Sequence, residues 1–164
     1  MMWVNILVVL VIFLSFFGGL KEGAVKRSFS LLAFIIAIPL AGLSYRLMVT
    51  LLSFLPGENW ENFFGFFITL GVISAILQLL FLLPRKLIHK AWHRGVLFRL
   101  AGGTLNIFNV AIGLVLFTFL IQAYPIIEWL AHVVHDSKAL TWLVARMSFI
   151  VSMLPEVFQD TVTV

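Results

Sequence analysis

The sequence predicts an all-α integral membrane protein with four transmembrane helices, an amphipathic helix on the inner face and a C-terminal helix that is interfacial or re-entrant. Of its 164 residues, 62% are hydrophobic and only 11% are charged, and the mean hydropathy is +1.12. A soluble domain carries roughly 25% charged residues, so a water-soluble fold would lack the polar surface to cover this much apolar area. No soluble stretch is long enough for a second core, and residues 1–164 are expected to form a single membrane domain.

The second observation is a basic segment that lies between two long apolar runs. Five of the eleven Lys and Arg residues fall between Arg85 and Arg99, and no acid is among them. Apolar runs of about 20 residues are typical of bilayer spans, and Lys and Arg gather in cytoplasmic loops. The segment therefore predicts the class of protein and the side of the membrane on which this loop lies.

The first predicted span covers residues 2–20. A cleaved signal peptide is the alternative, but it requires basic residues before the apolar run and a small-residue cleavage site after it. Here no charge precedes the run, whereas Lys21, Lys26 and Arg27 follow it. This order favours a span whose N-terminus lies outside.

Three further spans are predicted at residues 29–55, 63–83 and 100–123. The second contains Pro39, which is expected to kink the helix, and Arg46, whose long side chain can reach the interface. With four spans, the inner loops carry a charge of +7 and the outer segments carry −3, which together give the net charge of +4. The excess of basic residues inside places both termini on the extracytoplasmic side.

The basic segment is also a candidate lipid-binding helix that begins near Pro84 and ends near Gly95. On a helix, one half would carry the cations and two histidines, namely Arg85, Lys86, His89, Lys90, His93 and Arg94. The other half would carry Leu87, Ile88, Ala91 and Trp92. Such a helix lies on the inner leaflet with its cations toward anionic headgroups; the alternative is a loop that only sets topology. His89 and His93 have the spacing of a metal pair, but the surrounding cations would repel a divalent ion, so no metal site is expected there.

The fourth span carries small and amide residues on one stripe, at Gly102, Asn106, Asn109 and Gly113. Small residues allow helices to approach closely, and amide side chains form hydrogen bonds between helices. The stripe therefore serves helix packing, or it lines a pathway, because polar groups inside a membrane often mark function. Gly19 and Gly23 give a second close-approach segment beside the first inner loop.

After the fourth span, four ionisable residues fall on one helical face, at Glu128, His132, His135 and Asp136. They could bind zinc or sense pH; the alternative is the solvated face of an interfacial helix. Ser137 then has the character of an N-cap for a helix over residues 138–153, which is too short for a comfortable fifth span. The C-terminal segment 126–155 is thus expected at the outer face.

Catalytic and cofactor chemistry is not expected from this sequence. The spans contain no paired carboxylates and no phosphate-binding loop, and the absence of cysteine excludes disulfides and thiolate ligands. The positive charge lies beside the spans, so nucleic acid is not an expected partner. The expected partners are membrane lipids together with other membrane proteins or further copies of the chain.

Four segments together resemble the colicin V production protein (CvpA) family of bacterial inner-membrane proteins. They are Gly19 to Lys26, Arg99-Leu-Ala-Gly102, the basic loop between them, and Ser137 to Pro155, which closes on Leu154-Pro155. The resemblance covers about residues 3–158 and implies a four-span inner-membrane protein linked to colicin V production and envelope homeostasis. The chain departs from the family at Arg27, where an acid is common, and at Asn106 and Asn109-Val110, where Gly and then Arg-Gly are common.

Two functions remain open at this point. The first is a non-enzymatic scaffold or accessory factor that works through partners and lipid. The alternative is a small oligomeric channel or transporter whose path is lined by the stripe on the fourth span. The direction in which Asn106 and Asn109 point distinguishes them.

Overall fold

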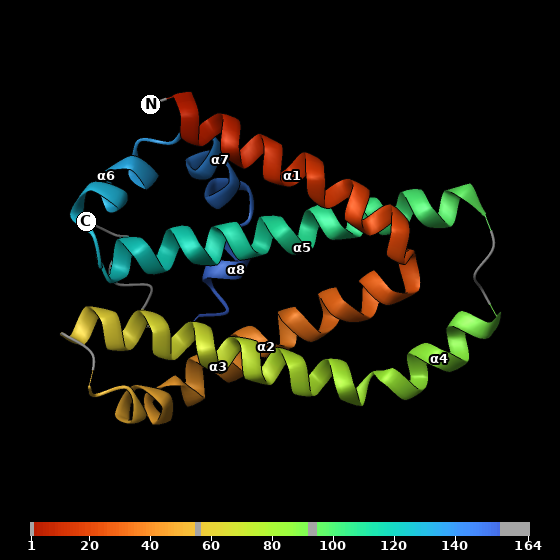
Figure 1. The fold of residues 1–164 in the computed structure, drawn as a ribbon, viewed down its shortest axis with the longest axis horizontal. Helices are drawn as coiled ribbons and strands as arrows, with labels where there is room; N and C mark the ends of the chain where they lie inside the picture. Colours follow the sequence, from red (N-terminus) through yellow and green to blue (C-terminus); the bar gives the residue numbers. More distant parts are fainter. Residues whose placement is uncertain (1, 55–56, 92–94, 155–164) are drawn as a thin grey trace.

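The computed structural model of the chain describes residues 2–54, 57–91 and 95–154, and these are helices joined by short turns, with no strand among them. In chain order the helices are α1 (Met2–Glu22), α2 (Ala24–Leu51), α3 (Glu58–Leu80), α4 (Leu82–Ala91), α5 (Val96–Ala123), α6 (Glu128–His135), α7 (Lys138–Arg146) and α8 (Ser148–Val151) (Figure 1). The predicted all-α class is confirmed.

Four of these helices, α1, α2, α3 and α5, are long and apolar enough to cross a membrane. Their limits differ from those of the predicted apolar runs, since α2 begins at Ala24 and α5 at Val96. Each has 28 residues, or about 42 Å at 1.5 Å per residue, against a hydrocarbon thickness of about 30 Å. Both helices are therefore longer than the apolar layer is thick, and a tilt or a protruding end would accommodate the excess length.

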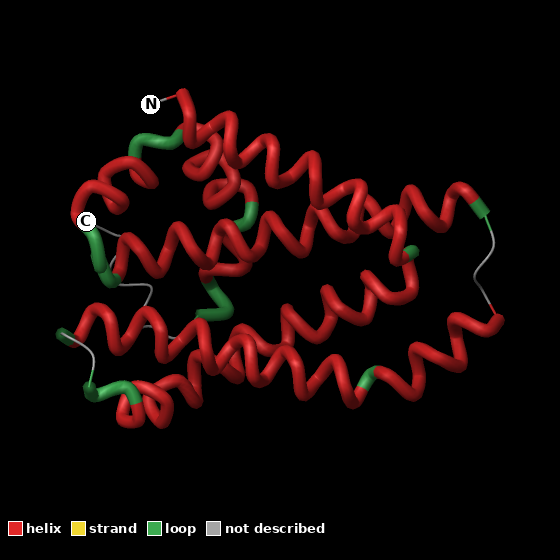
Figure 2. The backbone as a smooth tube through the Cα atoms, in the orientation of Figure 1, coloured by secondary structure: helices red, strands yellow, loops and turns green. Residues whose placement is uncertain are grey.

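The long helices form two pairs, α2 with α3 and α1 with α5, and the pairs meet where α2 packs on α5. Figure 1 shows α2 and α5 close together where α1 passes into α2 and apart at the opposite end, with α8 between them. The turns are short, with a single residue, Gly23, between α1 and α2 and another, Phe81, between α3 and α4 (Figure 2). The C-terminal segment, which includes α8, occupies the space between the diverging ends of α2 and α5.

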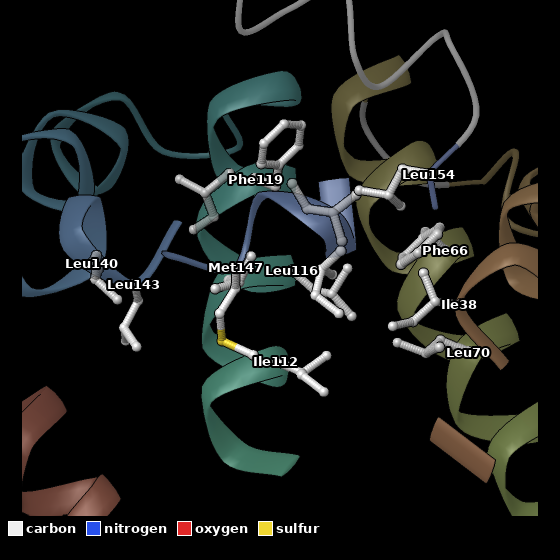
Figure 3. Packing of buried hydrophobic residues seen from close by; sticks show 14 of the residues in the cluster. Ile38, Phe66, Leu70, Ile112, Leu116, Phe119, Leu140, Leu143, Met147 and Leu154 are labelled. Carbon is white, nitrogen blue, oxygen red and sulfur yellow. The ribbon is translucent and has the colours of Figure 1, made fainter. Parts of the chain in front are cut away.

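The core lies around the C-terminal half of α5. Ile38, Phe66, Leu116 and Ile150 are fully buried there, and Figure 3 shows Leu154 beside Phe66 and Met147 beside Leu116. By contrast, large apolar side chains on the outer surfaces of the long helices are widely exposed. An apolar exterior around a packed interior is the distribution expected of a protein whose solvent is lipid.

The predicted single helix over residues 138–153 is wrong, because the chain leaves helical geometry at Met147 (φ −114°, ψ 32°) and forms α7 and α8. The two pieces have different neighbours: α7 packs on α1 and α5, whereas α8 packs on α5 and leads to Leu154 beside Phe66. One straight axis would not serve both surfaces. The depth of α7 and α8 in the bilayer stays a prediction.

The start of α7 is held by a polar contact with α1. Ser137 is its N-cap, as predicted, and its Oγ accepts the backbone N–H of Leu140 at 3.4 Å. Asn5 of α1 adds a second acceptor: its Oδ1 receives the Ser137 hydroxyl at 2.8 Å and the Ala139 N–H at 3.1 Å. The first N–H groups of a helix have no partner within it, and leaving them unpaired in apolar surroundings is costly. Asn5 therefore fixes α7 against α1.

Asn5→Ala is expected to lower the free energy of unfolding by about 1–3 kcal/mol, because two donors at the start of α7 lose their acceptor. The measurement is denaturant unfolding of the full chain in detergent. Asn59→Ala is the matched control, since Asn59 is exposed and makes only a 3.4 Å contact to the Pro125 carbonyl oxygen. Equal losses in the two variants would contradict the role given to Asn5.

Candidate functional site

The strongest candidate site is the place where α1 crosses α5, which we call the glycine crossing and define by Gly19, Gly102, Gly103 and Asn106. A Cβ on Gly19 would collide with the Gly102 carbonyl oxygen and lie 2.7 Å from the Gly103 Cα. A Cβ on Gly102 would lie 2.7 Å from the Gly19 carbonyl oxygen and 2.9 Å from the Ala24 nitrogen. The two backbones touch, and no larger residue fits at either position without displacing a helix.

Asn106 lies one turn along α5 from Gly102 and reinforces the same contact. Its side chain is 5% exposed, and its Nδ2 donates to the Ser15 carbonyl oxygen of α1 at 2.5 Å. Gly18 of α1 lies beside this amide, and a Cβ there would be in ordinary contact with the Asn106 Nδ2, at 3.6 Å. The first half of the predicted stripe is therefore a packing surface between α1 and α5.

The second half of the stripe faces elsewhere. The Asn109 Nδ2 donates to the Ser30 Oγ of α2 at 3.5 Å, a long contact, while the Asn109 Oδ1 is buried and accepts no hydrogen bond from the residues that the structure describes. At Gly113, an added Cβ would meet nothing within 4 Å. The four stripe residues thus do not line one continuous passage within the chain.

Gly23 takes part in the close approach predicted for Gly19 and Gly23, because a Cβ on Gly102 would lie 2.7 Å from the Gly23 carbonyl carbon. The Cα of Gly23 itself faces open space. Nothing lies within 4 Å of the position that a Cβ would take there. The residue has a φ of +76°, which glycine adopts without strain, and this lets the chain turn directly from α1 into α2. Beside it, Glu22 Oε2 lies 3.0 Å from Lys26 Nζ and 3.2 Å from Arg27 Nε, so two cations neutralise the one acid of this turn.

The predicted basic helix corresponds in part to α4. Arg85, Lys86 and Lys90 lie within it, and Lys86 and Ile88 are exposed. Arg94, like Trp92 and His93, lies outside the described residues. Within the described part, α4 contacts α2 and α3, and its position on a lipid surface stays a prediction.

The four ionisable residues predicted to share one helical face lie in α6 and at its C-terminal end. All four, Glu128, His132, His135 and Asp136, are exposed, and the opposite side buries Val133 and Val134. His135 Nδ1 lies 3.7 Å from Asp136 Oδ1, but the described residues contain no group of three side chains placed to hold a metal ion. The arrangement is that of an exposed polar helix face, and its surroundings stay a prediction.

Sequence reasoning missed Asn5 and the pair of Tyr45 and Tyr124. Burial and the neighbouring Tyr45 raise the pKa of Tyr124 to about 12, so its hydroxyl stays protonated and able to donate where α5 ends beside α2. A lone Asn inside an otherwise apolar run was a usable signal for Asn5. The two tyrosines gave none, because aromatic residues are common throughout the spans.

The fold and the site define the class: a polytopic helical membrane protein whose helices are held together by close backbone approach and amide hydrogen bonds. Comparison with protein families matches residues 4–148 to the colicin V production protein family. The chain belongs to that family. No curated protein and no solved structure matches it. The matched region includes Gly19 to Lys26 and Arg99 to Gly102, two segments of the resemblance that the fold brings together at the glycine crossing.

Gly102→Ala is expected to lower the free energy of unfolding by about 1–3 kcal/mol, because the added methyl would separate backbones already in contact. Gly113→Ala is the control on the same helix. It meets open space and is expected to be neutral, or to stabilise by up to about 1 kcal/mol through helix propensity. Denaturant unfolding of both full-length variants in detergent provides the comparison. A Gly102→Ala protein as stable as Gly113→Ala would rule out the close crossing.

Proposed function

We propose that this member of the colicin V production family is a non-enzymatic scaffold or accessory factor of the bacterial inner membrane, acting in colicin V production and envelope homeostasis. The observation that carries the proposal is the state of Asn106, which is buried and bonded to the α1 backbone. An amide used in this way is not available to a passing solute, and it stabilises a fixed arrangement of helices.

The exterior of the bundle supports a role in contact with lipid and partners. Only 17% of the apolar stretch of α1 is buried within the bundle, against 33% in α2 and α3 and 50% in α5. The exposed face of α1 is apolar and includes Ile6, Val9, Leu10 and Phe13, each of which is more than half exposed. We propose that this face contacts lipid, another membrane protein or a second copy of the chain.

The proposed orientation has both termini outside, α4 on the inner leaflet and the C-terminal segment at the outer face. The inner charge excess supports this orientation. In that arrangement the glycine crossing lies toward the cytoplasm and the contact of Asn5 with Ser137 lies toward the exterior.

A small oligomeric channel or transporter is the second candidate. It is favoured by the Asn109 Oδ1, which is buried and accepts no hydrogen bond within the described part of the chain. An unpaired amide oxygen in apolar surroundings is costly, and water would satisfy it if assembly of several protomers opened a path to this position. Four spans are few for a monomeric transporter, so this function requires further copies of the chain.

The test is a flux assay in proteoliposomes with a panel of ions and small polar solutes. The scaffold proposal predicts no flux above that of protein-free liposomes for wild type, Asn106→Leu or Asn109→Leu. It also predicts that Asn106→Leu lowers stability, since the bond to Ser15 is lost, and reduces secreted colicin V in producing cells. Flux through the wild-type protein that Asn109→Leu abolishes would contradict the scaffold proposal and select the channel.

A further inference from the structure

A charged hollow lies where α1 passes into α2 and α5 begins. Its volume is about 140 Å³, and its wall includes Lys21, Glu22, Gly23, Gly95 and Arg99. Lys21 and Arg99 are exposed, and they belong to the first and the last of the four long helices, α1 and α5. The glycine crossing brings them together, because Gly19 and Gly102 lie about one turn further into the bundle.

The lining of this hollow is positively charged, with Lys21 and Arg99 against Glu22. Its one acid, Glu22, is already engaged at 3.0 Å by Lys26 and at 3.2 Å by Arg27. Lys21 and Arg99 have no ion pair with any residue that the structure describes. The lining itself carries two cations and one acid, and because Lys26 and Arg27 outside the lining already engage that acid, Lys21 and Arg99 are left to meet an anion.

The backbone adds to this potential. Both α2 and α5 begin at the hollow, after Gly23 and Gly95, and neither start has a side-chain cap. The first N–H groups of a helix lack partners within it, and they carry a partial positive charge. The hollow thus combines two free side-chain cations with two uncapped helix starts.

The neighbouring surface indicates what kind of anion fits. Val96 and Leu97, the first residues of α5, are 74% and 83% exposed, directly after Gly95 at the rim. We place the start of α5 at headgroup depth, because Arg99 lies in its first turn and cations near helix ends reach the interface. Cations beside bare apolar side chains at that depth match a molecule with an anionic head and apolar chains.

We propose that this hollow binds the phosphate group of an acidic phospholipid in the adjoining leaflet, with Lys21 and Arg99 contacting the phosphate oxygens and the start of α5 contacting the acyl chains. The site is distinct from the predicted lipid contact of α4. It goes beyond the scaffold proposal, since neither a scaffold nor a channel requires it.

The test uses the full chain in detergent, titrated separately with phosphatidylglycerol, phosphatidylcholine and inorganic phosphate. Retained lipid is counted by native mass spectrometry, and Tm is measured in parallel. Phosphatidylglycerol is expected to be retained and to raise Tm, and phosphatidylcholine much less so. In Lys21→Gln/Arg99→Gln the affinity for phosphatidylglycerol should fall on the order of thirtyfold, because each basic residue near an anionic headgroup raises the affinity roughly fivefold.

Arg46→Gln/Lys138→Gln is the matched control, because it removes one Arg and one Lys from exposed positions outside both the hollow and α4. It should bind phosphatidylglycerol like the wild type. If the Lys21 and Arg99 double variant does not fold, Arg99→Gln alone should weaken binding and Arg99→Lys should restore most of it. Equal losses in the two double variants, or none in either, would overturn the site. Stabilisation by inorganic phosphate with no preference for phosphatidylglycerol would overturn the lipid as its source.

Discussion

The backbone contact between Gly19 of α1 and Gly102 of α5 determines how the rest of the bundle is arranged. Within a bilayer, helices gain little from apolar burial against one another, because lipid is equally apolar, and close packing of small residues takes its place. The contact brings the start of α2 against α5, since a Cβ added to Gly102 would lie only 2.9 Å from the Ala24 nitrogen. Lys21 and Arg99 meet at the same end for this reason.

Helices that touch at one end and diverge toward the other leave a space, and the C-terminal segment fills it. Fully buried Ile150 and nearly buried Leu154 enter this space, while the Asn5 contact with Ser137 fixes α7 against α1. The two ends of the bundle are thus held differently: one by contact between backbones, the other by an inserted segment with a polar anchor. Both devices use polar or small residues within an apolar chain, which favours a fixed assembly over a passage.

Much of this fold could be predicted, because long apolar runs, Pro and Gly positions and Ser137 have local physical consequences. The stripe on the fourth span was also visible, but a single helix does not reveal its neighbours: Asn106 meets α1 and Asn109 meets α2. The break at Met147 was hidden, since Leu140, Leu143, Met147, Ile150 and Leu154 fall on one face of a continuous helix. The break follows from the tertiary structure, because α7 packs on α1 and α5, whereas α8 leads to Leu154 beside Phe66 of α3. The role of Asn5 likewise depends on a residue 132 positions away.

The most direct measurement of the close crossing is oxidative cross-linking in native membranes, which the absence of native cysteine makes clean. A Cβ at Gly18 would lie 3.6 Å from the Asn106 Nδ2, so side chains at these two positions reach each other across the crossing, as the two sulfur atoms of a disulfide must. Gly18→Cys/Asn106→Cys is therefore predicted to cross-link rapidly within one chain, whereas Gly18→Cys/Gly113→Cys, two turns further along α5, is predicted not to. Equal cross-linking of the two pairs, or failure of the first, would contradict the packing of α1 on α5 from which the rest of the account is built.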